Sequence, residues 1–210
     1  MLFSKNLIAM AAVAFSMMAS TAIAQTTPDA APAEPIEIVD FGIGPVDAKV
    51  KVIEYASFTC PHCASFHATT YPQLKAEFID TGKIRFEYRE VYFDRYGLWA
   101  AMIARCGGEM RYFGIADMVF DQQKEWAASE DPAVVLENLK KIGRAAGLDD
   151  AAMDVCMQDK AMAEAMMAHY EKNFAADGIE GTPTFMINGT KHSNMSFEDM
   201  KVVLDAELAK

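Results

Sequence analysis

Two cysteines separated by two residues form the pattern in this sequence that is best suited to chemistry. They stand in the run Cys60-Pro61-His62-Cys63. A C-x-x-C pair brings two thiols within reach of one another, which suits either thiol–disulfide exchange or metal binding. The residues around the pair must therefore decide between these two chemistries.

The position of Cys60 favours the thiolate form of its side chain. Pro61 suits the first turn of a helix, because its missing N–H would have no partner there anyway. Cys60 then lies just before the helix, where unpaired N–H groups and the positive end of the helix dipole stabilise a negative sulfur. His62 adds a donor, and a cation when it is protonated. A low thiol pKa makes the disulfide oxidising, so we predict Cys60 as the nucleophile and Cys63 as the resolving thiol.

A metal site is the second interpretation of the same pair. C-x-x-C is also half of a zinc site, but the sequence contains no second C-x-x-C, and its one H-x₄-H pair, His62 and His67, overlaps the C-x-x-C motif itself. His67 follows Cys63 by one helical turn, so Cys60, Cys63 and His67 could bind a metal in a carrier protein. The redox context favours thiol chemistry with no metal and no other cofactor. A purely structural disulfide is disfavoured, because so short a loop constrains little of the unfolded chain.

The N-terminal residues have the pattern of a secretion signal. Lys5 gives a positive start, residues 7–19 are apolar but too few for a comfortable membrane span, and Ala22-Ile23-Ala24 is a small-x-small cleavage site. We expect residues 1–24 to be removed on export, with an uncleaved anchor helix as the alternative. Residues 25–35 are rich in Pro, Ala and Thr, and we expect them to form a flexible tether.

Export allows the other two cysteines to form a disulfide, because disulfides persist in an oxidising compartment. Four cysteines allow three pairings. C-x-x-C is the spacing that redox enzymes use, which leaves Cys106 and Cys156 as a structural bridge. The formal net charge of −11 is spread along the chain and argues against a nucleic-acid partner, which needs clustered Lys and Arg.

A strand, a helix and a second strand surround the C-x-x-C motif. Residues 50–56 are apolar and β-branched, which predicts a buried strand. The helix that begins at Pro61 has apolar residues at helical spacing and should kink at Pro72. Residues 84–93 are rich in Phe, Tyr and Val and predict a second strand, joined to the first by a right-handed parallel crossover.

The rest of the chain predicts helices and then a hairpin. Residues 95–177 are rich in Ala, Met, Leu, Glu and Lys and break at glycines, which indicates several short helices. A strand is predicted at residues 184–187, a tight turn at Asn188-Gly189, and a helix capped by Ser196. We therefore expect an α/β fold in one compact domain. Residues 36–94 and 178–210 would form its sheet, with residues 95–177 as a helical insertion.

These features together resemble the DsbA-like periplasmic thiol oxidases of the thioredoxin superfamily. The resemblance is carried by Ser57-Phe58-Thr59-Cys60-Pro61-His62-Cys63 after a strand, and by Gly181-Thr182-Pro183-Thr184-Phe185 with Asn188-Gly189 behind it. It covers nearly all of the chain after the tether. It implies a thioredoxin-like fold with an inserted helical subdomain, and a periplasmic location.

The resemblance also implies roles for individual residues. Pro183 would follow a cis peptide bond and face the reactive sulfurs, although most X-Pro bonds are trans. Thr182 would offer its backbone to an extended substrate segment. Glu54 matches the family's buried acid, which accepts or relays a proton as Cys63 reacts. A buried carboxylate needs a partner, and Arg89 is our prediction for it.

The implied function is a monomeric oxidase that donates its Cys60–Cys63 disulfide to reduced or unfolded exported proteins and is reoxidised by a membrane-bound partner. No dimerisation segment of the kind that isomerases use is recognised ahead of the domain, and this favours an oxidase. We expect an apolar substrate surface near Cys60, Thr182 and Pro183. Thr182 leaves the direction of electron flow open, since some relatives with Thr at this position act as isomerases or reductants.

The Cys106–Cys156 pair is a departure from the best-known members of this family, which lack it. We expect the bridge to staple helices of the insertion, because stapling needs only favourable loop closure. Tuning of the active site is the alternative.

Overall fold

A mixed β-sheet organises the part of the chain that this computed structural model describes, residues 36–210. The predicted signal and tether, residues 1–24 and 25–35, lie outside the described residues. The strand order is β1-β3-β2-β4-β5. β2 and β3 are parallel, and the other neighbouring strands are antiparallel. The strands are β1 (Phe41–Ile43), β2 (Val50–Ala56), β3 (Ile84–Glu90), β4 (Thr184–Ile187) and β5 (Thr190–Ser193).

Helices connect the strands in three groups. The first follows β2 and consists of α1 (Pro61–Thr69), α2 (Tyr71–Leu74) and a π-helical turn η1 (Lys75–Ile79). The second lies between β3 and β4 and consists of α3 (Arg95–Cys106), α4 (Glu109–Asp121), α5 (Gln123–Trp126), α6 (Pro132–Ala145), α7 (Asp150–Gln158) and α8 (Lys160–Ala176). The last helix is α9 (Phe197–Ala209). Among the described helices, none combines the length and apolar character that a membrane crossing requires.

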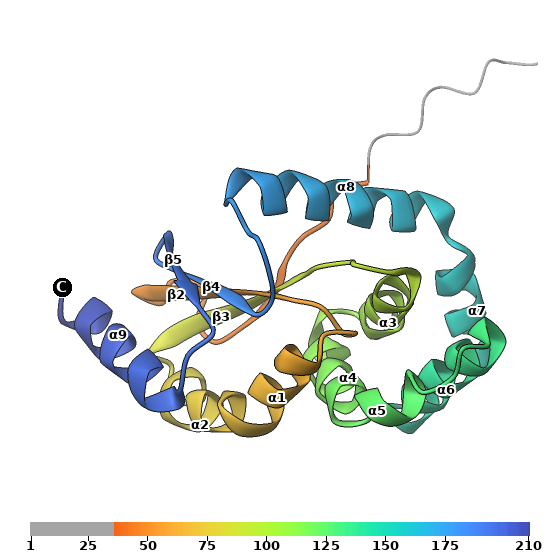
Figure 1. The fold of residues 1–210 in the computed structure, drawn as a ribbon, viewed down its shortest axis with the longest axis horizontal. Helices are drawn as coiled ribbons and strands as arrows, with labels where there is room; N and C mark the ends of the chain where they lie inside the picture. The colour runs from red at the N-terminus through yellow and green to blue at the C-terminus, as the bar shows by residue number, and fades with distance from the viewer. Residues whose placement is uncertain (1–35) are drawn as a thin grey trace, which may run out of the picture. The chain divides into compact units, whose positions relative to one another are not determined.

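The alternation of side chains along β2 determines which residues lie on each face of the sheet. Val50 and Val52 pack in the core beneath α1, α2 and α9, whereas Tyr55 packs on the opposite face with residues of α8. Figure 1 shows α8 on one side of the sheet and α1, α2 and α9 on the other. Since side chains alternate along a strand, Glu54 shares the face of Val50 and Val52. This alternation places a carboxylate under the helix that carries the C-x-x-C motif.

Most predicted elements appear where the sequence places them. The strand at residues 50–56, the strand at residues 184–187 and the parallel pairing of the first two predicted strands are all present. The predicted kink at Pro72 is a break in the helix, since α1 ends at Thr69 and α2 begins at Tyr71. Ser196 caps α9 by accepting a hydrogen bond from the Asp199 N–H, as predicted.

Two strand predictions need correction. β3 ends at Glu90 rather than at residue 93, because the chain turns after Val91 toward α3, whose N-terminus is capped by Asp94. β1 is absent from the sequence-based prediction. It has only three residues, and Gly42 lies at its centre, so neither strand propensity nor alternation marks it.

The second group of helices packs against the end of β3 and against the active-site helix. Its core includes Ile103 of α3, Val119 of α4 and Leu139 of α6, and it also contains Phe58 and Cys63. The predicted boundaries of an insertion at residues 95–177 remain a prediction, since this helical core is continuous with the residues around the C-x-x-C motif.

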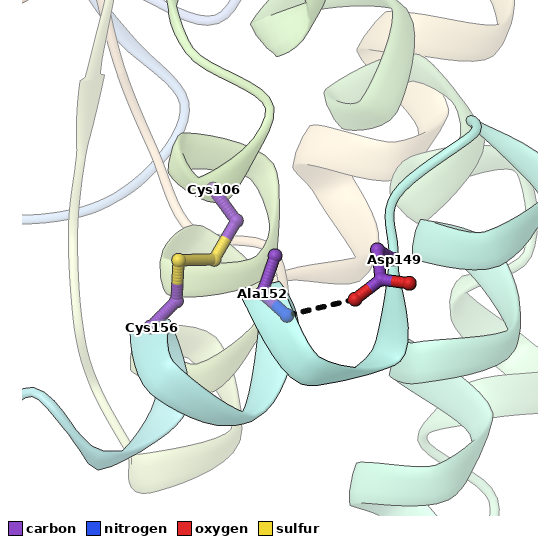
Figure 2. Close-up of a disulfide and its surroundings, with 4 residues drawn as sticks. All are labelled: Cys106, Asp149, Ala152 and Cys156. Carbon is purple, nitrogen blue, oxygen red and sulfur yellow. Dashed lines mark hydrogen bonds between the residues drawn. A yellow bond between two sulfur atoms is a disulfide. The ribbon is translucent and has the colours of Figure 1, made fainter.

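A disulfide joins Cys106, the last residue of α3, to Cys156 in α7. Figure 2 shows this bridge beside the N-terminus of α7, where the Asp149 carboxylate accepts a hydrogen bond from the Ala152 N–H. The predicted pairing is therefore present. The bridge spans 50 residues of sequence, so it ties together two helices that are otherwise joined by a long segment.

We expect the Cys106→Ala/Cys156→Ala double variant to unfold more easily than the wild type. Opening a loop of 50 residues restores conformational freedom to the unfolded chain and lowers the free energy of unfolding by about 2–4 kcal/mol. Urea unfolding with the Cys60–Cys63 pair oxidised measures this loss. In strong reductant, where both disulfides are open, the two proteins should become equally stable. Equal stability of the two proteins before reduction would contradict a stabilising role for the Cys106–Cys156 disulfide.

Candidate active site

Cys60 stands at the N-terminus of α1, as the N-cap residue, with Pro61 in the first turn of the helix. Its backbone is extended, and its carbonyl accepts the first helical hydrogen bond from the Ala64 N–H. The side chain is half-buried, and in its thiol form Sγ donates to the Thr182 carbonyl at 3.4 Å. Cys60 and Cys63 are both free thiols here, so the structure shows the dithiol form.

The surroundings of Cys60 lower the pKa of its thiol from an ordinary 9.0 to about 5. The largest cause is a hydrogen bond from the Cys63 thiol, which is stronger than the opposing effect of burial. The backbone N–H groups of Cys63 and His62 add to it. At neutral pH the Cys60 side chain is therefore a thiolate, which is the nucleophilic form.

Cys63 behaves in the opposite way, although it lies only one helical turn further on. Its side chain is fully buried. Burial raises the pKa of the Cys63 thiol, and the neighbouring Cys60 sulfur and the negative charge of Glu54 raise it further. The pair therefore holds one thiolate and one thiol, with the proton on the buried sulfur.

His62 contributes to the site through its backbone N–H, which is one of the groups that lower the pKa of Cys60. Its side chain is exposed, and the predicted role of its imidazole stays a prediction. The backbone contribution has a geometric reason. Cys60 lies at the end of the helix axis, where backbone N–H groups of the first turn converge, whereas the side chain of His62 projects away from the axis.

The peptide bond between Thr182 and Pro183 is cis, as the resemblance implied. This loop immediately precedes β4, which pairs with β2, so the sheet brings it beside the N-terminus of α1. The Thr182 carbonyl is the group that the Cys60 thiol contacts. The structure thus brings Cys60, Thr182 and Pro183 together.

A groove of about 410 Å³ borders the cis proline. Its lining includes Glu180, Thr184, Lys191 and Ser193. The apolar substrate surface that we expected is therefore not found in this groove, whose lining is mixed and largely polar. A lining of this kind favours recognition through backbone hydrogen bonds over recognition of apolar side chains.

Two side chains hold the loop before Cys60 in place. Gln123 of α5 is buried, and its amide donates hydrogen bonds to the carbonyls of Phe58, at 2.7 Å, and of Cys60, at 3.0 Å. Thr59 donates from its hydroxyl to Asp94, the residue that caps α3. The second group of helices therefore fixes the backbone on which the nucleophile sits.

Glu54 is fully buried, and its partner is His67 rather than Arg89. The distance between Glu54 Oε2 and His67 Nε2 is 3.0 Å. Arg89 is aligned with Tyr55 in the pairing of β2 with β3, so its side chain lies on the opposite face of the sheet. There it forms an ion pair with Asp40 at 2.5 Å. Our prediction of a Glu54–Arg89 pair was wrong by one position in the strand alternation.

His67 is a functional candidate whose environment the sequence did not reveal. Its ring is buried and contacts Glu54, so it does not join Cys60 and Cys63 in a cluster, and the described residues contain no group of three metal-ligating side chains. The signal that could have identified its partner is strand alternation, which puts Glu54 on the face that α1 covers.

Comparisons with known proteins agree with this geometry. The family described as Thioredoxin matches residues 37–206. A Rickettsia bellii protein whose assigned name is protein-disulfide oxidoreductase is 34% identical over 167 residues, which cover 79% of this chain and 63% of that protein. The chain thus spans less than two thirds of the length of this curated relative.

Solved structures include close matches to the fold. The crystal structure of Wolbachia pipientis alpha-DsbA1 matches with a TM-score of 0.76 and 29% identity, over 81% of this chain and 91% of that one. A protein-disulfide isomerase from Novosphingobium aromaticivorans matches with a TM-score of 0.70 and 24% identity, over 81% of this chain and 98% of that one. The second likeness is one of fold alone. The predicted thioredoxin-like fold is confirmed.

The lowered pKa of Cys60 predicts how the stability of the reduced protein depends on pH. The folded-state pKa of about 5 lies below the ordinary 9.0 of an unfolded thiol. The thiolate therefore contributes stability that is fully present above pH 9, and that contribution is lost as the pH falls through 5. Ultraviolet absorbance of the thiolate should titrate near pH 5. Cys60→Ser is the control and should lack both the absorbance change and this part of the pH dependence.

Proposed function

The chain belongs to the thioredoxin family, and from this membership we propose that it is a thiol–disulfide oxidoreductase that donates its Cys60–Cys63 disulfide to exported, folding proteins. The observation that carries the proposal is the opposite behaviour of the two sulfurs. The pKa of Cys60 is lowered and that of Cys63 is raised. A pair of this kind has one sulfur that leaves readily as a thiolate and one that holds a proton.

The exchange proceeds in two steps that balance. A substrate thiolate attacks Cys60 Sγ of the disulfide form, the Cys60–Cys63 bond breaks, and Cys63 leaves as a thiolate that takes up a proton. A second substrate thiolate then attacks the substrate's sulfur in the mixed disulfide, and Cys60 leaves as a stable thiolate. Two substrate thiols become one disulfide, and the protein is left as the dithiol. In a competing reaction of the mixed disulfide, Cys63 attacks Cys60 Sγ, re-forms the Cys60–Cys63 disulfide and releases the substrate as a reduced thiol.

The remaining residues of the predicted site receive supporting roles. Pro61 begins the helix whose N–H groups stabilise the Cys60 thiolate. Pro183 holds the loop beside that sulfur, and Thr182 offers its backbone to an extended substrate chain. Glu54 accepts or relays the proton of Cys63. Substrates would be reduced or unfolded proteins in the periplasm, and a membrane-bound partner would reoxidise the dithiol. The signal pattern of residues 1–24 supports this location.

An isomerase or reductant of the same fold is the second candidate. Thr182 precedes the cis proline, and a threonine at this position leaves the direction of electron flow open. The lowered pKa of Cys60 favours the oxidase, because a stable Cys60 thiolate stabilises the reduced form of the protein. A metal carrier is less well supported, since the His67 ring faces Glu54.

Single substitutions of the two cysteines test the assigned roles. With a reduced peptide that contains two cysteines as substrate, Cys60→Ser should abolish disulfide formation, because the attacked sulfur is gone. Cys63→Ser treated with glutathione disulfide should instead accumulate the mixed disulfide between Cys60 and glutathione, with release of one glutathione thiol, because the resolving thiol is missing. Mass spectrometry of acid-quenched samples detects both outcomes. The Cys106→Ala/Cys156→Ala variant should retain turnover, and full activity of Cys60→Ser would refute the proposal.

The direction of electron flow is tested by equilibrating the Cys60–Cys63 pair with glutathione buffers. A reduction potential above that of glutathione is expected, because the Cys60 thiolate stabilises the dithiol. The Cys106→Ala/Cys156→Ala variant isolates the active-site pair for this measurement. A potential well below that of glutathione would favour the reductant.

A further inference from the structure

Unpaired polar atoms gather beneath α1, although protein interiors rarely tolerate them. Glu54 Oε1, His67 Nδ1, Tyr71 Oη and Asp117 Oδ1 are all buried and lack a hydrogen-bond partner among the residues that the structure describes. Only one further side-chain atom in residues 36–210 shares this property, the hydroxyl of Thr182. A cluster of this kind is costly for stability, so it calls for a functional explanation.

The ring of His67 is held in a single orientation. It stacks on Phe120 of α4, with 4.0 Å between ring centroids, and lies 4.8 Å from the ring of Tyr71. Nε2 faces Glu54 Oε2 at 3.0 Å, and Nδ1 lies 3.8 Å from Asp117 Oδ1. The imidazole therefore spans the space between the carboxylate of β2 and the carboxylate of α4.

This arrangement extends from a buried sulfur to the surface. At the inner end, the charge of Glu54 acts on the Cys63 thiol. At the outer end, the side chain of Asp117 is 42% exposed. A cavity of about 230 Å³ adjoins this end and is lined by residues that include His67, Tyr71, Asp117 and Asp121. It is polar and large enough for water, which can bridge the distance between Nδ1 and Asp117.

We propose that His67 and Asp117 complete a proton relay that connects Cys63 Sγ, through Glu54, to the water-accessible cavity beside α4. The proposal rests on the thiol–disulfide exchange proposed above and assigns the outlet for the proton of the buried thiol. His67 and Asp117 act through Glu54 and do not touch the substrate, so they are positioning residues.

The steps balance in protons and electrons. When Cys63 resolves a mixed disulfide on Cys60, its thiol proton passes to Glu54 Oε1, the free oxygen of that carboxylate. The Cys63 sulfur forms a bond to Cys60 Sγ, and the Cys60–substrate bond breaks, with its electron pair leaving on the substrate thiolate. Loss of the charge of Glu54 then lets the imidazolium of His67 release its Nδ1 proton to the cavity, and the proton on Glu54 passes to the ring, which restores the carboxylate and the imidazolium. The reverse sequence delivers a proton to Cys63 when the disulfide opens.

The charges around His67 agree with this order of events. Burial alone would favour the neutral imidazole, but the charge of Glu54 and the carboxylate of Asp117 raise the pKa of His67 to about 9. The other ionisable groups near the ring are Tyr71 of α2 and Tyr88 of β3, both with a raised pKa, and Lys75 and Asp121 at the cavity. Protonation of Glu54 removes the charge that keeps the ring protonated. The ring can therefore pass a proton to the cavity when Glu54 receives one from Cys63.

Nitrogen NMR of the His67 ring tests the relay directly. At pH 7 we expect an imidazolium in the wild-type dithiol protein and a neutral ring in Glu54→Gln, which lacks the carboxylate charge, with His67→Gln used to assign the signals. The same protonation state in both proteins would overturn the proposal. A histidine whose charge is not coupled to Glu54 would give that result, and the readout needs no substrate. Failure of the relay is therefore distinguishable from failure of the proposed function.

Kinetics provide a second test, with glutathione disulfide as the probe. In His67→Gln, the attack of the Cys60 thiolate should keep its wild-type rate, whereas release of glutathione by Cys63 should slow by about 10-fold or more at pH 7, since general acid–base catalysis contributes at least that much. Asp117→Asn at the partly exposed end should slow the same step, and it is the fallback if His67→Gln misfolds. Asp121→Asn, in the same cavity but outside the relay, should match the wild type. Unchanged release in Asp117→Asn would overturn the proposal.

Discussion

A helix that begins at one cysteine and includes another one turn later cannot give the two sulfurs the same surroundings. Cys60 lies at the open end of α1, where backbone N–H groups converge, and Cys63 lies in the core. The first environment stabilises a charge and the second excludes it. The readiness of Cys60 to leave as a thiolate and the need for a proton acceptor near Cys63 both depend on this asymmetry.

The elements around α1 maintain that asymmetry by fixing the backbone before Cys60. The amide of Gln123 donates hydrogen bonds to the carbonyls of Phe58 and Cys60. Asp94 caps α3 and also accepts a hydrogen bond from Thr59. Both side chains come from segments that follow β3, far away in the sequence. The helical group between β3 and β4 therefore supports the geometry of the nucleophile, in addition to enlarging the core.

The sequence predicts the local features of the site well, because they depend on short spacings. The C-x-x-C pair, the helix that begins at Pro61 and the strand that carries Glu54 all follow from patterns within a few residues. The partner of Glu54 does not, because it depends on which face of the sheet each residue occupies in two strands at once. Gln123 gives no signal at all, since a single glutamine in a helical segment is ordinary until its amide is seen to meet two carbonyls.

Two buried charge clusters lie on opposite faces of the sheet, and they differ in whether their buried polar atoms have hydrogen-bond partners. On the α8 face, Arg89 binds Asp40, Asp177 and the hydroxyl of Tyr55. The buried polar atoms of that cluster have partners within the described residues, which is what a stabilising network requires.

On the α1 face, Glu54 and His67 each keep one buried atom without a partner. Buried ion pairs contribute little to stability even when every atom is satisfied, so an incomplete one is hard to explain by stability. An acceptor that must be free to take a proton, however, cannot also be saturated with hydrogen bonds. The unpaired oxygen of Glu54 is consistent with that requirement. Nδ1 of His67 is a donor that must release its proton to the cavity, and it likewise has no fixed partner among the described residues.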